Sequence, residues 1–153
     1  MDLKILNNLQ KKLDVNIYKL LDEVFKQNQI QSTMVEFNQD QLQSGYDALN
    51  QKINTIGGSP YRAYTVKRKK KKGQPTNIVT LYDTGEFYET FNVRIVKDGY
   101  EIIADFQKGD ESILDNFTSN FDFLGLDLEG QTELVQQHVY PVLYNLLRKQ
   151  IGL

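Results

Sequence analysis

Residues 78–95, with the sequence IVTLYDTGEFYETFNVRI, contain the pattern that decides the fold. Residues 78–82 alternate in character and are rich in β-branched and aromatic side chains, which predicts a strand. Asp83, Thr84 and Gly85 follow and predict a tight turn. An Asp side chain can accept hydrogen bonds from backbone N–H groups two residues on, and glycine adopts a positive φ without steric cost.

The second half of this stretch predicts a helical turn and then two further strands. Residues 86–91 can form one helical turn, which would place Phe87 and Phe91 on the same face because they are four residues apart. Residues 92–96 and 100–106 have strand character, and the Lys-Asp-Gly sequence between them predicts the turn that joins them. We therefore expect this unit of strand, turn, helical turn and hairpin to form the core of the fold.

The composition is that of a folded protein. The chain has 153 residues, of which 40% are hydrophobic and 25% charged, so we expect a single domain over residues 1–153. There is no cysteine, which excludes disulfide bonds, thiolate catalysis and cysteine-ligated metals. The N-terminal segment lacks an unbroken apolar stretch, and no run of about 18 apolar residues occurs, so neither a signal peptide nor a membrane span is expected.

The charge of the chain is unevenly distributed. One run of six residues carries a third of the 18 cationic side chains: Lys67, Arg68, Lys69, Lys70, Lys71 and Lys72. The formal net charge is −2, and it would be −8 without this run, so the remainder of the chain is acidic. We expect the run to lie in a basic loop over residues 67–77, either as a solvated hairpin tip or mobile loop or as an arm that contacts phosphates. A nuclear-import signal is a third interpretation.

The N-terminal part predicts a helix followed by the start of the β core. Apolar residues spaced three to four apart, with Lys and Gln between them, predict an amphipathic helix over about residues 2–28. Residues 33–37 alternate and predict a short strand. This strand would be the first of a β core that spans about residues 33–106.

The C-terminal part, residues 110–151, is expected to be helical. A short helix is predicted over residues 113–117, and a strong apolar periodicity predicts a long helix over about residues 132–150. Pro141 lies inside the long helix and should bend it or divide it after His138. The whole order predicts an α+β fold in which a small antiparallel sheet, a meander, packs against long N-terminal and C-terminal helices.

The sequence offers few candidates for catalysis. His138 is the single histidine, and its neighbours are helical core residues, so a structural role fits it better than a Ser-His-Asp triad. Clusters of metal ligands, a Walker loop and a GxGxxG motif are all absent. We therefore predict no catalytic, cofactor-binding or metal-binding residue, and we expect the protein not to be an enzyme.

The Asp83-Thr84-Gly85 motif after an apolar strand resembles the active-site motif of retroviral-type aspartic proteases. That resemblance implies a dimer in which two carboxylates share one proton. This sequence departs from the family pattern at Glu86, where the proteases carry a small residue, and its two long helices are foreign to such β-rich enzymes. The protease is therefore the second alternative function.

A second resemblance covers roughly residues 33–150. The turn Asp83-Thr84-Gly85 with the sequence EFYETF after it, the GQPT and VTL segments before it, and FLGL at residues 123–126 ahead of the last helix resemble virion-morphogenesis proteins of tailed bacteriophages. These are the structural proteins of the head–tail junction and of tail completion, and the similarity extends to crAss-like phages that infect Bacteroidetes. The resemblance implies a structural role for the turn and no cofactor.

The resemblance also implies what the protein would assemble with. Identical subunits of such proteins form a closed ring through head-to-tail contacts, as an adaptor, stopper, tail-completion or tail-terminator subunit. The implied partners are copies of the same chain and other phage proteins, namely the portal, a neighbouring ring, and the tail tube or hub. The expected location is the virion, after assembly in the cytoplasm of the host bacterium. On this interpretation the run from Lys67 to Lys72 contacts packaged DNA or a neighbouring ring, whereas the first alternative is a small nucleic-acid-binding protein that acts through the same run.

Overall fold

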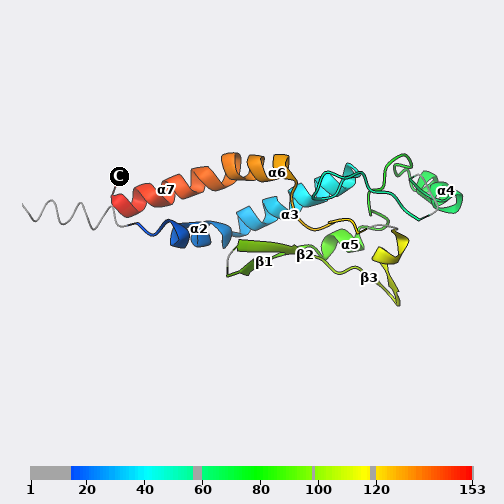
Figure 1. Ribbon diagram of the computed structural model, residues 1–153, viewed down its shortest axis with the longest axis horizontal. Coiled ribbons are helices and arrows are strands. Elements are labelled where there is room, and N and C mark those ends of the chain that lie inside the picture. Colours follow the sequence, from blue (N-terminus) through cyan, green and yellow to red (C-terminus); the bar gives the residue numbers. More distant parts are fainter. Residues whose placement is uncertain (1–14, 57–59, 98, 118–119, 153) are drawn as a thin grey trace, which may run out of the picture.

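The computed structural model describes residues 15–56, 60–97, 99–117 and 120–152 of the chain. The predicted α+β class is confirmed, because helices at both ends of the described chain combine with short antiparallel strands. The molecule is elongated, with the longer helices lying along its axis and one basic helix at its far end (Figure 1). Residues 2–14 of the predicted N-terminal helix lie outside the described residues.

From residue 15 onward, where the description of the chain begins, two helices follow one another in the N-terminal part. α2 (Ile17–Phe25) begins after Asn16, whose side chain accepts a hydrogen bond from the backbone N–H of Lys19. α3 (Asn28–Gln43) starts after a two-residue break and continues in the same general direction (Figure 1). The expected single helix therefore ends near Phe25, and a second helix occupies the region where residues 33–37 predicted a strand.

The predicted strand at 33–37 is wrong because burial in this segment has a helical period. Ile30, Met34, Asn38 and Leu42 are spaced four apart and are all buried in α3. Asn38 is buried but polar. A search for apolar residues at helical spacing therefore misses this position and with it the helical period of the segment. The hydroxyl of Thr33 donates to the carbonyl of Gln29, a bond that stays within the helix.

The C-terminal helical part is one continuous rod with a widened turn. It consists of α6 (Leu128–Glu133), the π-helical segment η2 (Leu134–Val139) and α7 (Tyr140–Ile151). In η2 the backbone N–H of Tyr140 donates to the carbonyl of Val135, five residues earlier. Pro141 is the second residue of α7, so the predicted interruption near this proline takes the form of a π turn, one of the usual causes of a helix irregularity. α7 packs against α2.

The strands form two separate antiparallel ribbons. β1 (Asn92–Val96) pairs with β2 (Gly99–Ile103), with Val93 opposite Ile102, as the sequence predicted for this hairpin. β3 (Gln107–Lys108) and β4 (Glu111–Ser112) form a second, very short ribbon. The 3-10 turn η1 (Ile113–Asn116) follows it at the place of the predicted short helix. Asp98, in the predicted turn of the first hairpin, lies outside the described residues.

Residues 78–82 do not form the predicted strand. The backbone groups of Thr80 are satisfied by side chains instead, since its N–H donates to the Tyr61 hydroxyl at 3.0 Å and its carbonyl accepts from the Tyr88 hydroxyl. Leu81 has a positive φ of 52°, which an extended strand does not allow. Val79 and Thr80 are consecutive residues and both are buried, so the segment is enclosed on both sides without being part of a sheet.

The turn after this segment leads into the core. α5 (Glu86–Glu89) is the predicted helical turn, and it starts directly after Gly85, whose φ is +101°. The rings of Phe87 and Phe91 lie 5.1 Å apart, and both side chains are buried, as the four-residue spacing predicted. A chain of aromatic contacts continues from Phe87 through Phe106 to Phe123. The turn is thereby joined to the segment that precedes the C-terminal helix.

Polar side chains of α3 hold that segment in place. The Asn38 amide donates to the carbonyl of Phe123 at 3.0 Å and accepts from the N–H of Gly125 at 3.2 Å. The Gln41 amide bonds the carbonyl of Gly125 and the N–H of Asp127 in the same way. The FLGL segment is therefore an irregular connection whose backbone is satisfied by buried amides, which is the condition for burying a loop.

Candidate functional site: the basic helix and the Asp83 turn

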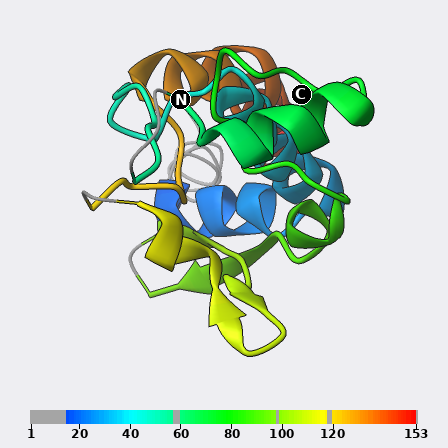
Figure 2. The ribbon, with the colours of Figure 1, turned by 90° about the vertical axis from the view of Figure 1, so that its right-hand side faces the viewer.

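The basic run forms a helix and not the predicted loop. α4 (Ala63–Lys71) includes most of the run, and Lys72 follows as its C-cap (Figure 2, where α4 lies nearest the viewer). Lysine and arginine have good helix propensity, and their position in the last turn complements the negative end of the helix dipole. Like charges four residues apart normally oppose helix formation, so these cations need a compensating anion.

Asp83 supplies that anion. Its carboxylate accepts hydrogen bonds from Arg68 at 3.3 Å, from Lys108 of β3 at 2.8 Å, and from Lys72. The Asp83 turn thus connects α4 with the second β ribbon. Hydrogen bonds from Lys108 and from Lys72 hold the pKa of the Asp83 carboxyl well below its ordinary value.

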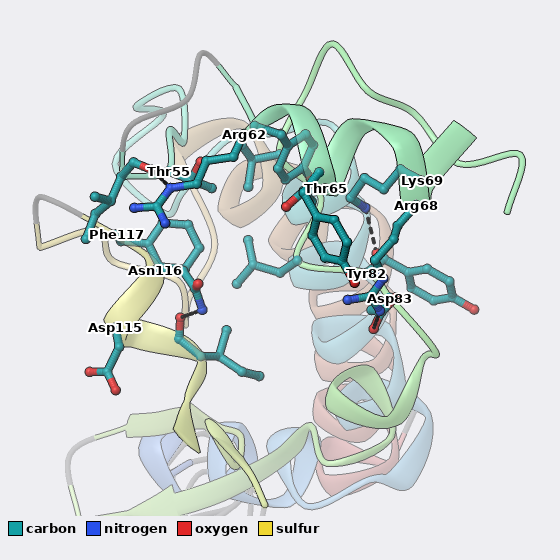
Figure 3. A pocket seen from close by; sticks show the side chains of 16 residues that line it. Thr55, Arg62, Thr65, Arg68, Lys69, Tyr82, Asp83, Asp115, Asn116 and Phe117 are labelled. Carbon is teal, nitrogen blue, oxygen red and sulfur yellow. Dashed lines mark hydrogen bonds and ion pairs between the residues drawn. The ribbon is translucent and has the colours of Figure 1, made fainter. Parts of the chain in front are cut away.

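Lys69 is the buried member of the run. Its side chain is only 7% exposed, and its ammonium group donates to the carbonyl of Tyr82 at 2.8 Å (Figure 3). The same ammonium lies 5.0 Å from the centre of the Tyr61 ring and 3.4 Å from the side-chain oxygen of Gln74. Burial lowers the pKa of Lys69, although the Asp83 charge opposes this shift.

Other groups complete the attachment of α4 to the turn. The amide of Gln74, just after the helix, donates to the carbonyl of Asp83 at 2.7 Å. The hydroxyl of Tyr61, just before the helix, accepts from Thr80, and burial raises the pKa of Tyr61. Burial also raises the pKa of Tyr88, whose hydroxyl donates to the carbonyl of Thr80. We call these contacts, together with those of Asp83 and Lys69, the α4 clamp.

The remaining cations of the run face outward. Lys67, Lys70 and Lys71 are exposed, and no carboxylate of the described residues lies within ion-pair distance of them. The structure therefore divides the predicted contact residues into two groups. Arg68, Lys69 and Lys72 bind the turn, whereas Lys67, Lys70 and Lys71 form what we call the free lysine face.

A cavity of about 530 Å³ lies between α4 and η1. Figure 3 shows Arg68 and Lys69 on one side of it and Asp115, Asn116 and Phe117 on the other, and Arg62 also lines it. The cationic groups in this lining already have partners, because Arg62 donates to the carbonyl of Ile56 at 3.0 Å while Arg68 and Lys69 belong to the clamp. The cationic side chains that line the cavity therefore already have hydrogen-bond partners within the chain.

The surroundings of Asp83 bear on the aspartic-protease alternative. A protease dyad needs two carboxylates that share a proton, which raises the pKa of one of them. Three cations surround Asp83 and keep it ionised, which is the opposite electrostatic arrangement. The geometry therefore disfavours proton transfer by this carboxyl group.

The described part of the chain contains no group of three or more His, Asp or Glu side chains close enough to hold a metal ion. None of the helices in this part has the length and the apolar character that a membrane crossing requires. No family model, curated protein or solved structure matches the chain.

Sequence reasoning found Asp83 and the basic run separately but not their pairing. Asp83 is 15 residues from Arg68 and 25 from Lys108, so no local pattern indicates the cluster. The feature of the sequence that could have indicated the pairing is the negative charge of Asp83 close in sequence to a dense cationic run. The burial of Lys69 had no signal in the sequence, since its neighbours are of the same type.

Proposed function

We propose that the protein is a structural subunit of a tailed-bacteriophage virion, which assembles with identical copies into a ring at the head–tail junction or in the tail. The resemblance of residues 78–95 and of the FLGL segment to virion-morphogenesis proteins supports this proposal. On this proposal the protein is not an enzyme, its partners are its own copies and neighbouring phage proteins, and its location is the virion.

One surface observation carries the proposal. Four large apolar side chains on the C-terminal rod are exposed to solvent: Leu128 (79%), Val135 (49%), Tyr140 (63%) and Tyr144 (50%). Leu128 and Val135 are seven residues apart, which is about two helical turns. Val135 and Tyr140 are joined by the π-helical hydrogen bond, and Tyr144 follows one α-helical turn later. The four side chains therefore follow one face of the rod, which we call the apolar stripe.

The π turn is what keeps this face continuous. Residues five apart would lie on different sides of a regular α-helix, whereas a π turn places them above one another. Leu134 and Val139, also five apart, are both buried, so the same turn preserves the inner face of the rod. The inner face packs on the core, and exposed apolar side chains that include two tyrosines are typical of a protein–protein contact.

A second copy of the chain is the occupant that we propose for the apolar stripe. A ring requires two different surfaces on each subunit that fit one another, and the stripe would supply one of them. Tyrosine side chains suit such contacts because they bury a large area and lose little rotamer freedom.

The oligomeric state tests the proposal. We expect the purified chain to form a closed oligomer of defined size in native mass spectrometry, and the double variant Tyr140→Lys/Tyr144→Lys to be monomeric. The matched control Asn145→Lys/Gln150→Lys adds the same charge to exposed positions off the stripe and should leave the oligomer intact. A monomeric wild type, or equal dissociation of both variants, would contradict the role of the stripe.

The virion location has its own measurement. Quantitative peptide mass spectrometry of density-purified particles of the source phage should find this chain at a low, fixed copy number, far below that of the capsid subunit. Absence from mature particles would contradict a ring in the virion even if the isolated chain oligomerises.

A further inference from the structure

The free lysine face has the geometry of a contact surface. Lys67, Lys70 and Lys71 are three and four residues apart, so their side chains project from neighbouring positions on one side of α4. None of them has an acidic partner among the described residues. Their charges are therefore available to a group outside the chain.

The α4 clamp fixes this face in position. Lys69 is buried against Tyr61 and the carbonyl of Tyr82, and Arg68 and Lys72 both bind Asp83. The three outward lysines consequently sit on a helix that is attached through its opposite side. A ligand that binds them does not have to order a loop, which removes one of the usual costs of association.

The local charge is strongly positive although the chain as a whole is not. Of seven cationic side chains, the six of the run and Lys108, three pair with Asp83, and the ion pairs of the described residues give the run no other carboxylate. The cluster lies at one end of the long axis (Figure 1). Without the run the remaining formal charge would be −8, so a polyanion would be attracted to this end and repelled by the rest of the surface.

We propose that the free lysine face of α4 binds the phosphate backbone of duplex DNA without regard to its sequence. The binding would be electrostatic, because each lysine that neutralises a phosphate releases condensed counterions. This inference goes beyond the ring function and does not depend on it.

The types of residue on the free lysine face favour DNA over an acidic protein surface. The arginine of the run, which could form directed forked contacts with a carboxylate, is turned toward Asp83. The outward residues are all lysines, which act as point charges on flexible stems. Such groups suit a dense, regular array of phosphates, since contacts to the backbone carry no sequence information.

Fluorescence anisotropy of labelled duplexes tests the proposal. Two duplexes of equal length and unrelated sequence would be titrated with the full chain over a series of salt concentrations. The contact variant is Lys67→Gln/Lys70→Gln/Lys71→Gln. The matched control is Lys19→Gln/Lys52→Gln/Lys149→Gln, which removes the same charge at exposed positions outside α4.

We expect the wild type to bind both duplexes alike. The contact variant should lose about tenfold or more in affinity near physiological salt, and its slope of log K against log salt should be smaller by about three. The control should keep the wild-type slope. The third variant Lys67→Arg/Lys70→Arg/Lys71→Arg keeps the charges and should keep the slope as well, because the slope depends on the number of cations that meet phosphates.

Three outcomes would overturn the proposal. These are the absence of wild-type binding at low salt, an equal loss of affinity in the contact and control variants, and an unchanged slope in the contact variant. If the contact variant changes only the oligomeric state, the lysines meet another protein surface and the DNA proposal is wrong. Because DNA affinity is read separately from oligomer size, failure here leaves the ring proposal intact, and failure of the ring leaves this proposal intact.

Discussion

At the scale of single residues, Asp83 is a carboxylate that pairs with three cationic side chains from two different elements and the C-cap of α4. Its position in an Asp-Thr-Gly turn resembles a protease motif, but its partners are Arg68, Lys72 and Lys108. A carboxylate with three cationic neighbours is a poor proton acceptor, because the cations favour its ionised form. The same ion pairs connect the elements that carry the cations. In the fold it joins the last turn of α4 and its C-cap to β3.

The ion pairs of Asp83 predict that the substitution Asp83→Asn lowers the free energy of unfolding by an amount that depends on pH. The pKa of the Asp83 carboxyl is lower in the folded state than in the unfolded chain. The ion pairs of Asp83 therefore stabilise the fold fully above the ordinary carboxyl pKa of about 4, and this stabilisation declines as the pH falls from there toward the folded-state pKa. The partners are partly exposed and screened by solvent, so we expect a loss of about 1 kcal/mol at neutral pH.

Urea unfolding of wild type and Asp83→Asn at pH 7 and at pH 3 would measure this difference. The gap in free energy of unfolding should be smaller at pH 3. Asp115→Asn is the control, since Asp115 has no ion pair among the described residues. A gap that stays constant with pH would show that the ion pairs of Asp83 do not stabilise the fold.

At the scale of elements, α4 has two faces of almost identical composition and different surroundings, one bound to the Asp83 turn and one exposed. The sequence does not distinguish them, because the inward face is selected by Tyr61, Gln74 and the Tyr82 carbonyl, which lie outside the run. Adjacent lysines in the run therefore contribute differently to stability.

Lys69→Met and Lys70→Met form a matched pair that tests this difference. Both substitutions keep most of the aliphatic stem and remove the charge. Loss of the Lys69 ammonium leaves the Tyr82 carbonyl without that donor in a partly buried site, so we expect a cost of about 1–3 kcal/mol in the free energy of unfolding. Lys70 is exposed, and its replacement should change stability by less than about 0.5 kcal/mol. Equal effects in denaturant titrations would refute the division of the helix into two faces.

Elements whose determinants are local could be predicted from the sequence. The β1–β2 hairpin, the α5 turn with Phe87 and Phe91, and the C-terminal rod all follow from short-range spacing. The failures have determinants that are distant in the chain. Asn38 is buried in α3 because its amide bonds the backbone of Phe123 and Gly125, more than 80 residues away. Residues 78–82 have no strand partner because the hydroxyls of Tyr61 and Tyr88 bond the backbone of Thr80.

The candidate site also combines features that the sequence predicts with features that depend on contacts between distant residues. The basic run and the Asp-Thr-Gly turn were visible as motifs, but the ion pairs between them required the three-dimensional arrangement. The apolar stripe also escaped prediction, since Val135 and Tyr140 are five residues apart and share a face only through the π turn. An α-helical period assigns them to different sides.

At the scale of the whole molecule, two surfaces of opposite chemistry are separated along the long axis. The apolar stripe follows the C-terminal rod, and the free lysine face lies at the α4 end (Figure 1). Apolar contacts are insensitive to screening by salt or strengthened by it, whereas lysine–phosphate contacts weaken steeply. The two proposed associations should therefore respond to salt in opposite directions.

Sedimentation velocity of the chain with and without duplex DNA, at low and at high salt, would measure both responses in one sample. We expect the oligomer to persist or to become more populated as salt rises, while DNA leaves the complex over the same range. Dissociation of the oligomer in step with the DNA would mean that charged groups hold the subunits together, and the apolar stripe would then not be the contact. Retention of DNA at high salt would require apolar or hydrogen-bonded contacts to the bases, which the free lysine face does not offer.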